Sequence, residues 1–206
     1  MDNQPSISSD RATRFILLGA SNVSLNLARI VSLLRQWRGA NLEIFIAAGH
    51  GRSYGLASRV LGRELPAIRT CDLWTVIPQR EAMPTYALIT DIGNDIAFGA
   101  TPNEITSWIE TTIDHLGAIE ARVAMTGLPM ASLDRLGPWR YSLFRQVLFP
   151  GSQVRWRQAL ERAAMLQSKL DTLARDRHVF QIEQPGDWYG WDPIHVHRRH
   201  RTEAWT

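Results

Sequence analysis

FILLGASN, residues 15–22, is the stretch of sequence that decides the fold. Four apolar residues run into three small residues and an asparagine, and a long segment with apolar residues at helical spacing follows. This order is typical of a buried strand that ends abruptly and turns into a helix. It predicts Ser21 at the carboxyl end of a strand and the amino end of a helix, the edge at which open α/β sheets bind ligands. The helix N-terminus favours negative charge developing there, whereas the plainer interpretation of Ser21 is a helix N-cap.

Length and composition exclude several classes of protein. At 206 residues, with 45% hydrophobic and 21% charged side chains, the chain suits one soluble globular domain. No stretch approaches the roughly 18 apolar residues of a transmembrane helix, so we expect no stable membrane insertion. Cys71 is the only cysteine, which excludes an intrachain disulfide, and the polar first ten residues lack the apolar core of a signal peptide. These features favour a cytoplasmic location.

The basic residues are almost all arginine. They outnumber the acidic residues by 23 to 20, and Lys169 is the single lysine among them. We interpret this usage as compositional bias and predict no nucleic-acid partner. The stretch Val154–Arg157, which mixes arginine with an aromatic residue, is the part of the chain that favours the opposite interpretation.

Short apolar runs alternate about five times with longer amphipathic segments. Strands are predicted over 14–19, 42–48, 86–90, 122–126 and 179–182, with an edge strand over 73–77. Helices are predicted over 22–37, 101–115 and 154–175, with a short helix over 54–61. This alternation predicts a single-domain, three-layer α/β/α sandwich of about five mainly parallel strands, flavodoxin-like in architecture. We expect the domain to span 14–206 and to follow a flexible leader over 1–13.

Chemically useful residues follow the predicted strands. Ser21 follows the first strand, a glycine turn around Gly51 follows the second, and Gly93-Asn94-Asp95 follows the third; the C-terminal tail carries Asp192-Pro-Ile-His195. Because the carboxyl ends of parallel strands share one edge of the sheet, we expect these groups to converge there. Acyl transfer needs such a set: a serine that attacks a carbonyl, a histidine that accepts its proton, a carboxylate that orients the histidine, and donors for the oxyanion.

These four segments, around Ser21, Gly51, Asn94 and His195, occur in the order of the motif blocks of the SGNH/GDSL hydrolases. The family is named for the Ser, Gly, Asn and His of those blocks. The chain resembles this family from about Arg14 to His195. The resemblance implies an SGNH-hydrolase-like fold and a nucleophile at Ser21. It also implies that His195 is the general base and Asp192 the carboxylate that orients it, because these residues fit the family's Asp-x-x-His block without gaps.

The resemblance further implies an oxyanion hole. Its donors are the backbone N–H groups of Ser21 and Gly51 and the side-chain amide of Asn94. Gly49 is the alternative to Gly51.

Two motif positions depart from the family pattern. The first block usually reads Gly-Asp-Ser-Leu, and Ala20 stands where the family has the aspartate that often braces the turn. We expect Asn22 to replace that brace in part. The third block usually reads Gly-x-Asn-Asp, and Ile92 occupies its first glycine position.

Several side chains are expected near the reacting groups. The residues predicted to line the substrate site are Asn22, His50, Arg52, Tyr54 and Trp191. For Arg52, pairing with an anionic part of a substrate and pairing with a local carboxylate are both open. The aromatic segment 139–149 has four interpretations, namely a lid, an acyl-chain pocket, a homo-oligomer contact, and core packing over the sheet edge.

The leading functional prediction is a serine-dependent carboxylester hydrolase that acts on a small-molecule ester through an acyl-enzyme. No cofactor is expected, and no metal site, because the clustered histidines of the tail are a weak ligand signal. The alternative is a non-catalytic ligand-binding protein on the same scaffold, since a fold does not determine a function.

Overall fold

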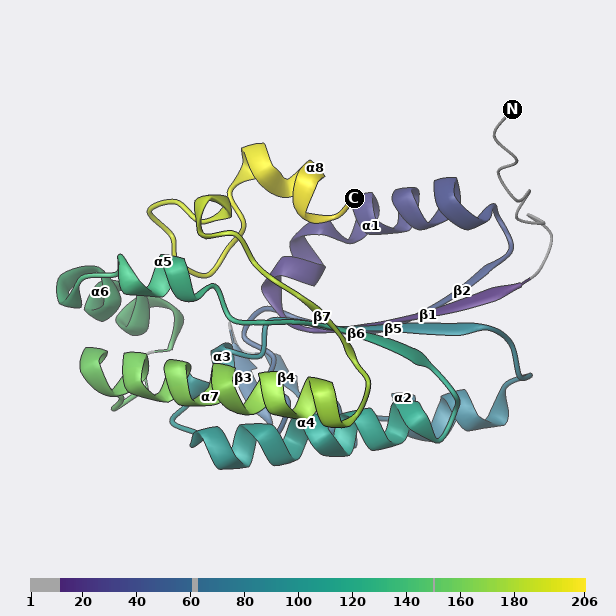
Figure 1. Ribbon diagram of the computed structural model, residues 1–206, viewed down its shortest axis with the longest axis horizontal. Coiled ribbons are helices and arrows are strands. Elements are labelled where there is room, and N and C mark those ends of the chain that lie inside the picture. The colour runs from purple at the N-terminus through teal and green to yellow at the C-terminus, as the bar shows by residue number, and fades with distance from the viewer. Residues whose placement is uncertain (1–11, 61–62, 150) are drawn as a thin grey trace.

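Five parallel strands form the central layer of the structure, a computed structural model that describes residues 12–60, 63–149 and 151–206 (Figure 1). In chain order the strands are β1 (Thr13–Leu18), β2 (Leu42–Ala47), β5 (Thr85–Ile89), β6 (Arg122–Thr126) and β7 (Phe180–Ile182). Their order across the sheet is β2-β1-β5-β6-β7, and every neighbouring pair is parallel. The chain therefore moves outward from β1 to β2 and then returns past β1 to β5. This reversal makes the β1–β5 junction the switch point at which α/β sheets hold ligands.

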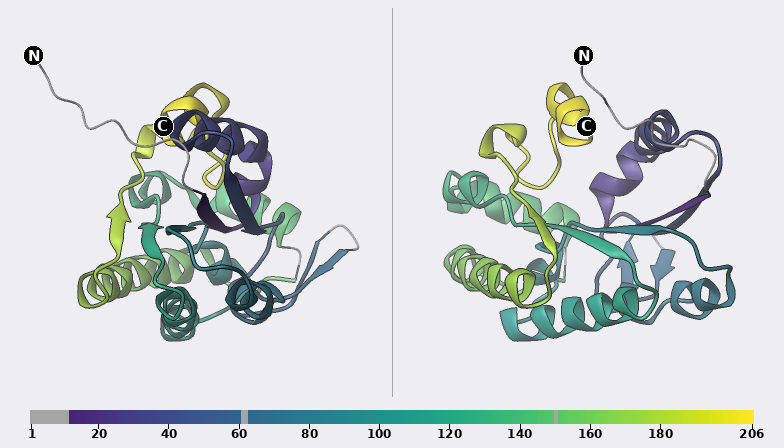
Figure 2. Two further views of the ribbon diagram at one scale, coloured as in Figure 1. Left: turned by 90° about the vertical axis from the view of Figure 1, so that its right-hand side faces the viewer. Right: turned by 45° about the vertical axis from the view of Figure 1, so that its right-hand side comes forward.

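Helices cover both faces of the sheet (Figures 1 and 2). One face carries α1 (Ser21–Arg38) and the short C-terminal α8 (Arg201–Ala204). The other face carries α2 (Leu73–Val76), α4 (Pro102–Gly117) and α7 (Trp156–Asp176). The predicted three-layer α/β/α sandwich is confirmed.

The larger apolar core lies between the sheet and the α4–α7 layer. Both helices contribute fully buried side chains at helical spacing, namely Ile105, Ile109 and Leu116 from α4 and Leu166 and Leu170 from α7. The smaller core, beneath α1, includes Leu17, Val23 and Ile30. Because β1 lies between these two cores, all six of its residues are buried, as expected for a central strand of a parallel sheet.

Short elements complete the loops at the two ends of the sheet. They are the hairpin β3 (Ser58–Val60) and β4 (Arg63–Leu65), the helices α3 (Asn94–Ala97), α5 (Met130–Asp134) and α6 (Pro138–Leu148), and the 3-10 turns η1 (Ile68–Thr70), η2 (Ile77–Gln79), η3 (Gly186–Trp188) and η4 (Arg198–His200). Thus α6 occupies most of the aromatic segment. Within the part of the chain that the structure describes, no helix is long and apolar enough to span a membrane.

The start of α4 follows its sequence signal closely. The Thr101 hydroxyl accepts the N–H of Glu104, and the Glu104 carboxylate accepts the N–H of Thr101 at 2.8 Å, so both ends of the predicted cap are present. Pro102 takes the first helical position, where its missing N–H costs no hydrogen bond.

Two predicted elements are wrong. Residues 73–77 form α2 and the start of η2 rather than an edge strand, because Trp74 stacks on His115 of α4 and donates its ring N–H to the carbonyl of Ile68. Residues 54–61 do not form a helix over the part that is described, since β3 begins at Ser58. Short apolar runs fit either period, so tertiary contacts decide between them.

The predicted leader, 1–13, falls largely outside the described residues. Its final residue, Thr13, is already the first residue of β1 and is buried.

Candidate active site

The turn between β1 and α1 holds Ser21 at the first position of the helix. Its sharpness depends on Gly19, where a Cβ atom would lie 2.8 Å from side-chain carbons of both Thr90 and Val23. A side chain at this position would collide with both, so the close approach of the turn to Thr90 and Val23 requires glycine. Ser21 itself is buried, and its hydroxyl is directed toward the C-terminal loop, as its contact there shows.

Ser21, His195 and Asp192 form a continuous chain of hydrogen bonds. The Ser21 Oγ atom lies 2.9 Å from Nε2 of His195, and Nδ1 of His195 lies 2.6 Å from Oδ2 of Asp192. The other carboxylate oxygen of Asp192 accepts the N–H groups of Ile194 and His195 at 2.9 and 3.1 Å. The Asp-x-x-His spacing therefore folds the loop onto its own carboxylate, and the structure brings this loop to Ser21, which lies 174 residues before His195.

The electrostatics of this chain of hydrogen bonds stabilise the charged forms of both His195 and Asp192. The hydrogen bond to Asp192 raises the pKa of His195 above its usual 6.5, with partial burial opposing the rise and the charges of Asp192 and Asp91 adding to it. Burial opposes ionisation of Asp192, but the hydrogen bonds from the His195 ring and from the Ile194 N–H hold the pKa of Asp192 below its usual value.

Asp91 and Asn22 join the serine turn to the histidine loop. One oxygen of Asp91 accepts the backbone N–H groups of Ala20 and Asn22 at 2.8 and 3.1 Å, and the other accepts the Asn22 side-chain amide at 2.7 Å. That amide also donates to the carbonyl of Ile194, and its oxygen accepts the N–H of Val196. We call this pair the Asp91–Asn22 clamp. Because Ile194 and Val196 flank His195, the clamp sets the position of the histidine relative to the serine.

The clamp explains how the chain dispenses with the aspartate of the usual first block. Ala20 carries no carboxylate, and Asp91, at the end of β5, supplies one to the same turn. Asp91 adopts a left-handed backbone conformation, φ 60°, which aspartate tolerates better than most residues. Burial raises its pKa, with the hydrogen bonds from Asn22 and Ala20 opposing the rise. Sequence reasoning assigned part of the brace to Asn22 and missed Asp91; the signal was an acidic residue directly after a buried strand.

The glycine loop after β2 is held by a second carboxylate, that of Asp95. Asp95 accepts the Ser53 hydroxyl and, at 3.0 Å, the N–H of Tyr54. The Ser53 oxygen in turn accepts the N–H groups of Gly55 and Leu56 at 3.1 and 2.9 Å. Burial raises the pKa of Asp95 to about 6, against the effect of the Ser53 and Tyr54 hydrogen bonds.

Two of the three predicted oxyanion donors, Gly51 and Asn94, lie in the segments that Asp95 connects, and the third, the Ser21 N–H, lies at the start of α1. Asn94 is buried at the first position of α3, next to Asp95 itself. Gly51 precedes the Ser53–Tyr54 anchor by two residues and has a φ of 63°, a conformation that favours glycine. Gly49, the alternative, accepts the N–H of Arg52 within the same turn.

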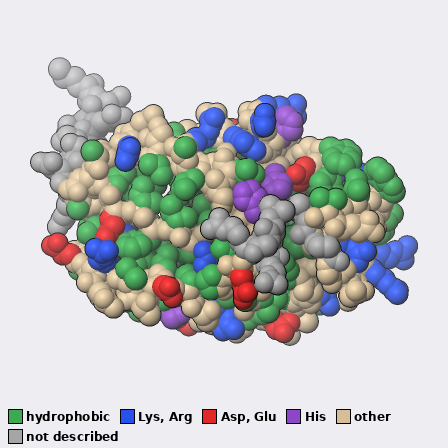
Figure 3. Space-filling model, turned by 180° about the vertical axis from the view of Figure 1, so that it is seen from behind, with side chains coloured by type: hydrophobic (Ala, Val, Ile, Leu, Met, Phe, Trp, Pro, Cys, Tyr) green, Lys and Arg blue, Asp and Glu red, His purple; other side chains and the backbone are tan. Residues whose placement is uncertain are grey.

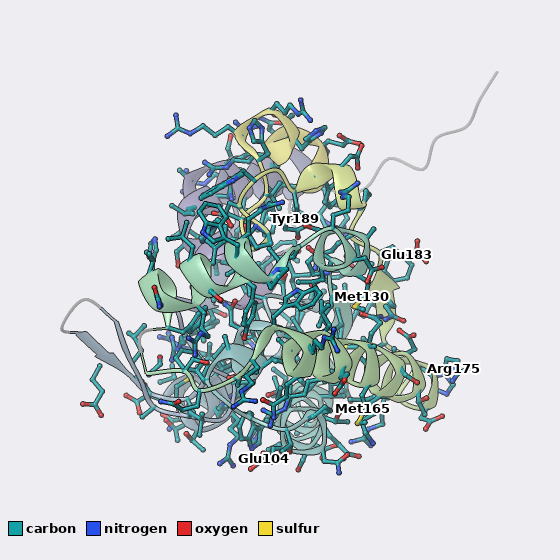
Figure 4. All side chains as sticks on the ribbon, turned by 90° about the vertical axis from the view of Figure 1, so that its left-hand side faces the viewer. Glu104, Met130, Met165, Arg175, Glu183 and Tyr189 are labelled. Atoms are coloured by element: carbon teal, nitrogen blue, oxygen red, sulfur yellow. The ribbon has the colours of Figure 1, made fainter. Side chains whose placement is uncertain are left out.

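Beneath the clamp and the histidine loop lies a cavity of about 120 Å³. The clamp residues Asn22 and Asp91 and the loop residue Ile194 form one end of its wall. The rest is mainly apolar and comes from α3, α5, α6, α7 and the loops after β6 and β7; examples are Ile96, Leu128, Leu133, Phe144, Phe149, Leu160 and Ala163. Tyr189, labelled in Figure 4 above Met130 of α5, also lines it.

The residues predicted to line a substrate site lie in different places in the structure. Asn22 lines the cavity, but Tyr54 is buried in the core, where its hydroxyl binds the carbonyls at the ends of β1 and β5. Arg52 is also buried, and its guanidinium donates to the carbonyl of Pro66, the residue after β4. His50 and Trp191 are exposed. Both side chains stabilise the loop after β2, and their contact with a substrate stays a prediction.

The tail histidines other than His195 form local contacts. His197 accepts the N–H of Arg199, and His200 lies 3.2 Å from the Glu203 carboxylate. Over 12–60, 63–149 and 151–206, no three His, Cys, Asp or Glu side chains lie close enough together to hold a metal ion.

Comparisons with known proteins establish the fold. No protein-family model matches the chain, and no curated protein matches its sequence. A member of the lipolytic protein G-D-S-L family from Veillonella parvula aligns with a TM-score of 0.60 at 14% identity over 93% of both chains. Est24, a carbohydrate acetylesterase from Sinorhizobium meliloti, aligns with a TM-score of 0.60 at 15% identity over 93% of this chain and 94% of that one.

A third similar structure is the inhibitor-bound aryl esterase of M. smegmatis, with a TM-score of 0.59 at 16% identity over 93% of this chain and 94% of that one. The chain therefore has the SGNH/GDSL-hydrolase-like fold that its four sequence blocks predict.

Proposed function

We propose that this protein is a serine-dependent carboxylester hydrolase. The observation that carries the proposal is the chain of contacts from the Ser21 hydroxyl through His195 to Asp192, at 2.9 and 2.6 Å. A serine, a histidine within hydrogen-bond reach and a carboxylate on the far ring nitrogen are the parts that acyl transfer requires. Esterase activity in proteins of the same fold supports the proposal.

The reaction begins with attack on the ester carbonyl. With its proton on Nδ1, held by Asp192, the His195 ring accepts the Ser21 proton at Nε2 while Ser21 Oγ bonds to the carbonyl carbon. Collapse of the tetrahedral intermediate breaks the bond to the alcohol oxygen, which takes that proton from Nε2. Water then attacks the acyl-enzyme by the same route and releases the acid.

The charge on the carbonyl oxygen requires donors that are already in place. We assign this role to the N–H groups of Ser21 and Gly51 and to the amide of Asn94, with the N-terminus of α1 adding its dipole. Removing one such donor typically costs about 10² to 10³ in rate. The clamp keeps Ser21 and His195 in register through the two steps, because both segments bind the same pair of side chains.

The acyl group is assigned to the cavity beneath the histidine loop. Its polar wall residues are already occupied: the Tyr141 hydroxyl donates to the carbonyl of Val154, and Gln184 binds both the carbonyl of Gly127 and the hydroxyl of Tyr189. The cavity therefore offers an occupant mainly apolar contact. An aliphatic or aromatic acyl group fits this environment better than a sugar does.

Replacement of the nucleophile tests the reaction. Purified protein is expected to hydrolyse a soluble activated ester and to be labelled at Ser21 by a fluorophosphonate probe. Ser21→Ala should lose both by a factor of 10³ or more, since only binding and the oxyanion donors remain. Ser24→Ala is the matched control, because Ser24 lies one turn further along α1 and is more exposed than Ser21. Labelling that persists in Ser21→Ala, or a wild-type protein that is never labelled, contradicts the assignment and favours a binding protein.

Filling the cavity tests the place of the acyl group. Ala163 is a buried wall residue on α7, and Ala163→Leu should reduce kcat/KM for long acyl chains by roughly tenfold or more while sparing acetyl esters. Ala164→Leu, at the exposed neighbouring position, is the control. The measurement is a series of esters of one alcohol with increasing acyl length. A uniform loss for all acyl lengths contradicts the assignment.

A further inference from the structure

The helix α6 has two apolar sides. One side faces the cavity through Phe144 and the capping residue Phe149. On the other side, Trp139 and Val147 are 70% and 69% exposed, and Leu143 between them is partly exposed. Positions four and eight residues apart lie on one face of a helix, so these three form an apolar stripe along α6. Nothing within residues 12–60, 63–149 and 151–206 covers the two outer members of this stripe.

Trp191 extends the stripe toward the candidate active site. Its ring is 57% exposed and lies 4.9 Å from the Phe144 ring. The Arg140 guanidinium donates to the carbonyls of Gly190 and Trp191 and so fixes α6 against the loop that carries the next residue, Asp192. Trp139, Leu143, Val147 and Trp191 together form what we call the α6 patch. In Figure 3 hydrophobic side chains gather at the right-hand end of the molecule, the end that α6 occupies.

The charged side chains of the segment that carries three of the four patch residues all have one sign. The segment 135–149 contains three arginines and no acidic residue. Arg135 and Arg140 are tied to carbonyls of the C-terminal segment, and Arg145 is tied to the carbonyl of Ser152. The flanking carboxylates are Asp134, just before the segment, and Asp192, which follows Trp191 and is bonded to the His195 ring. Tryptophan and arginine around an apolar helix face are the side chains that favour the interface of an anionic lipid layer.

We propose that the α6 patch docks the protein onto an anionic lipid surface and that the ester substrate is taken from that surface. The inference rests on the proposed function and names its substrate class, a lipid-borne ester. Docking by the outer side of α6 places the cavity, lined by the inner side of the same helix, directly behind the contact surface. An acyl chain that leaves the lipid layer therefore has a short apolar path to the clamp and Ser21.

A second copy of this chain is a poorer occupant of the α6 patch. A symmetric pair would place the same surface on both partners, so Arg135 and Arg140 of each copy would face those of the other. An anionic lipid layer instead supplies negative charge to the arginines and an apolar phase to Trp139 and Val147. Charge complementarity thus selects the lipid surface.

The test measures binding to vesicles and hydrolysis separately. The full chain is mixed with sedimentable vesicles of phosphatidylglycerol and phosphatidylcholine, or of phosphatidylcholine alone, and the bound fraction is measured. The wild-type protein should bind the anionic vesicles about tenfold or more tightly than the neutral ones. The double variant Trp139→Ser/Val147→Ser should lose this binding. Phe180→Ser, which removes a 71% exposed apolar side chain on β7, should retain it.

The results separate the docking proposal from the proposed function. All three proteins should hydrolyse a soluble short-chain ester at similar rates, because neither variant touches the reacting groups. Wild-type protein that hydrolyses this ester but ignores anionic vesicles overturns the docking proposal alone. Vesicle binding that depends on Trp139 and Val147, without hydrolysis of any ester, supports docking and overturns the function. Docking on lipid is overturned if Phe180→Ser loses vesicle binding as much as the double variant does. It is also overturned if the wild-type protein binds no vesicles and instead forms a dimer that dissociates in the double variant.

Discussion

Asp91, partly buried, and Asp95, fully buried, are four residues apart, and they hold different halves of the candidate active site. Asp91 binds the serine turn directly and, through Asn22, the loop of His195. Asp95 binds Ser53 and Tyr54 and so holds the glycine loop after β2. Both follow β5, the strand at which the order of strands across the sheet reverses. One short segment therefore positions loops that come from three other parts of the chain.

The difference between them lies in what surrounds each charge. The negative charge of Asp91 adds to the rise in the pKa of His195. Asp91 therefore acts on the reacting groups both by position and by charge, whereas the contacts of Asp95 are with the loop after β2. Exchanging each carboxylate separately distinguishes these two contributions.

The largest expected effect is on the reaction rate. Asp91→Ala removes the acceptor of three N–H donors and frees both the serine turn and the histidine loop, so kcat/KM should fall by about 10² to 10³. Asp95→Ala displaces the glycine loop, which carries one oxyanion donor, and should cost about tenfold. Steady-state kinetics on a soluble ester measure both, with circular dichroism showing that each variant is folded. A larger loss in Asp95→Ala would reverse the comparison.

The next effect is on stability. Because the pKa of Asp95 is raised from 3.8 to about 6, the folded state binds its proton more tightly than the unfolded state does. The resulting stabilisation is fully present below about pH 4 and is lost as the pH rises through about 6. Asp95→Asn removes this titration.

A pKa raised from 3.8 to about 6 corresponds to roughly 3 kcal/mol, so the free energy of unfolding of the wild type should fall relative to Asp95→Asn by that order between pH 4 and 7. Urea unfolding at a series of pH values measures the difference. Parallel curves for the two proteins would show that Asp95 has an ordinary pKa.

The smallest effect is on the pH profile. His195 must be neutral to accept a proton, so kcat/KM rises with pH through the pKa of His195, which lies above 6.5. Asp91→Asn removes a negative charge that raises this pKa, after the larger effect of the Asp192 hydrogen bond, and should move the acidic limb to lower pH. Asp95→Asn should leave the limb in place. A limb that does not move in Asp91→Asn shows that the role of Asp91 is positional.

The sequence predicted the serine, histidine and aspartate of the hydrogen-bonded chain better than it predicted the residues around them. Ser21, Asp192 and His195 were identified from a strand–turn–helix pattern and a local Asp-x-x-His spacing, and the structure brings them into contact. Arg52 and Tyr54 were placed near the substrate because they follow a strand end. Whether such a side chain turns toward the site or into the core depends on partners distant in sequence, such as the carbonyls of Leu18 and Pro66.

By itself, the sequence determined the layers of the fold, the strand edge that holds the site and the local form of the histidine loop. Each of these follows from apolar periodicity, from small residues at turns or from hydrogen bonds between near neighbours. Only the tertiary structure decided that Asp91 replaces the carboxylate missing at Ala20, that α2 is a helix, and that α6 has an inner side on a cavity and an outer side on solvent. These outcomes depend on contacts between residues far apart in sequence, and no local pattern specifies them.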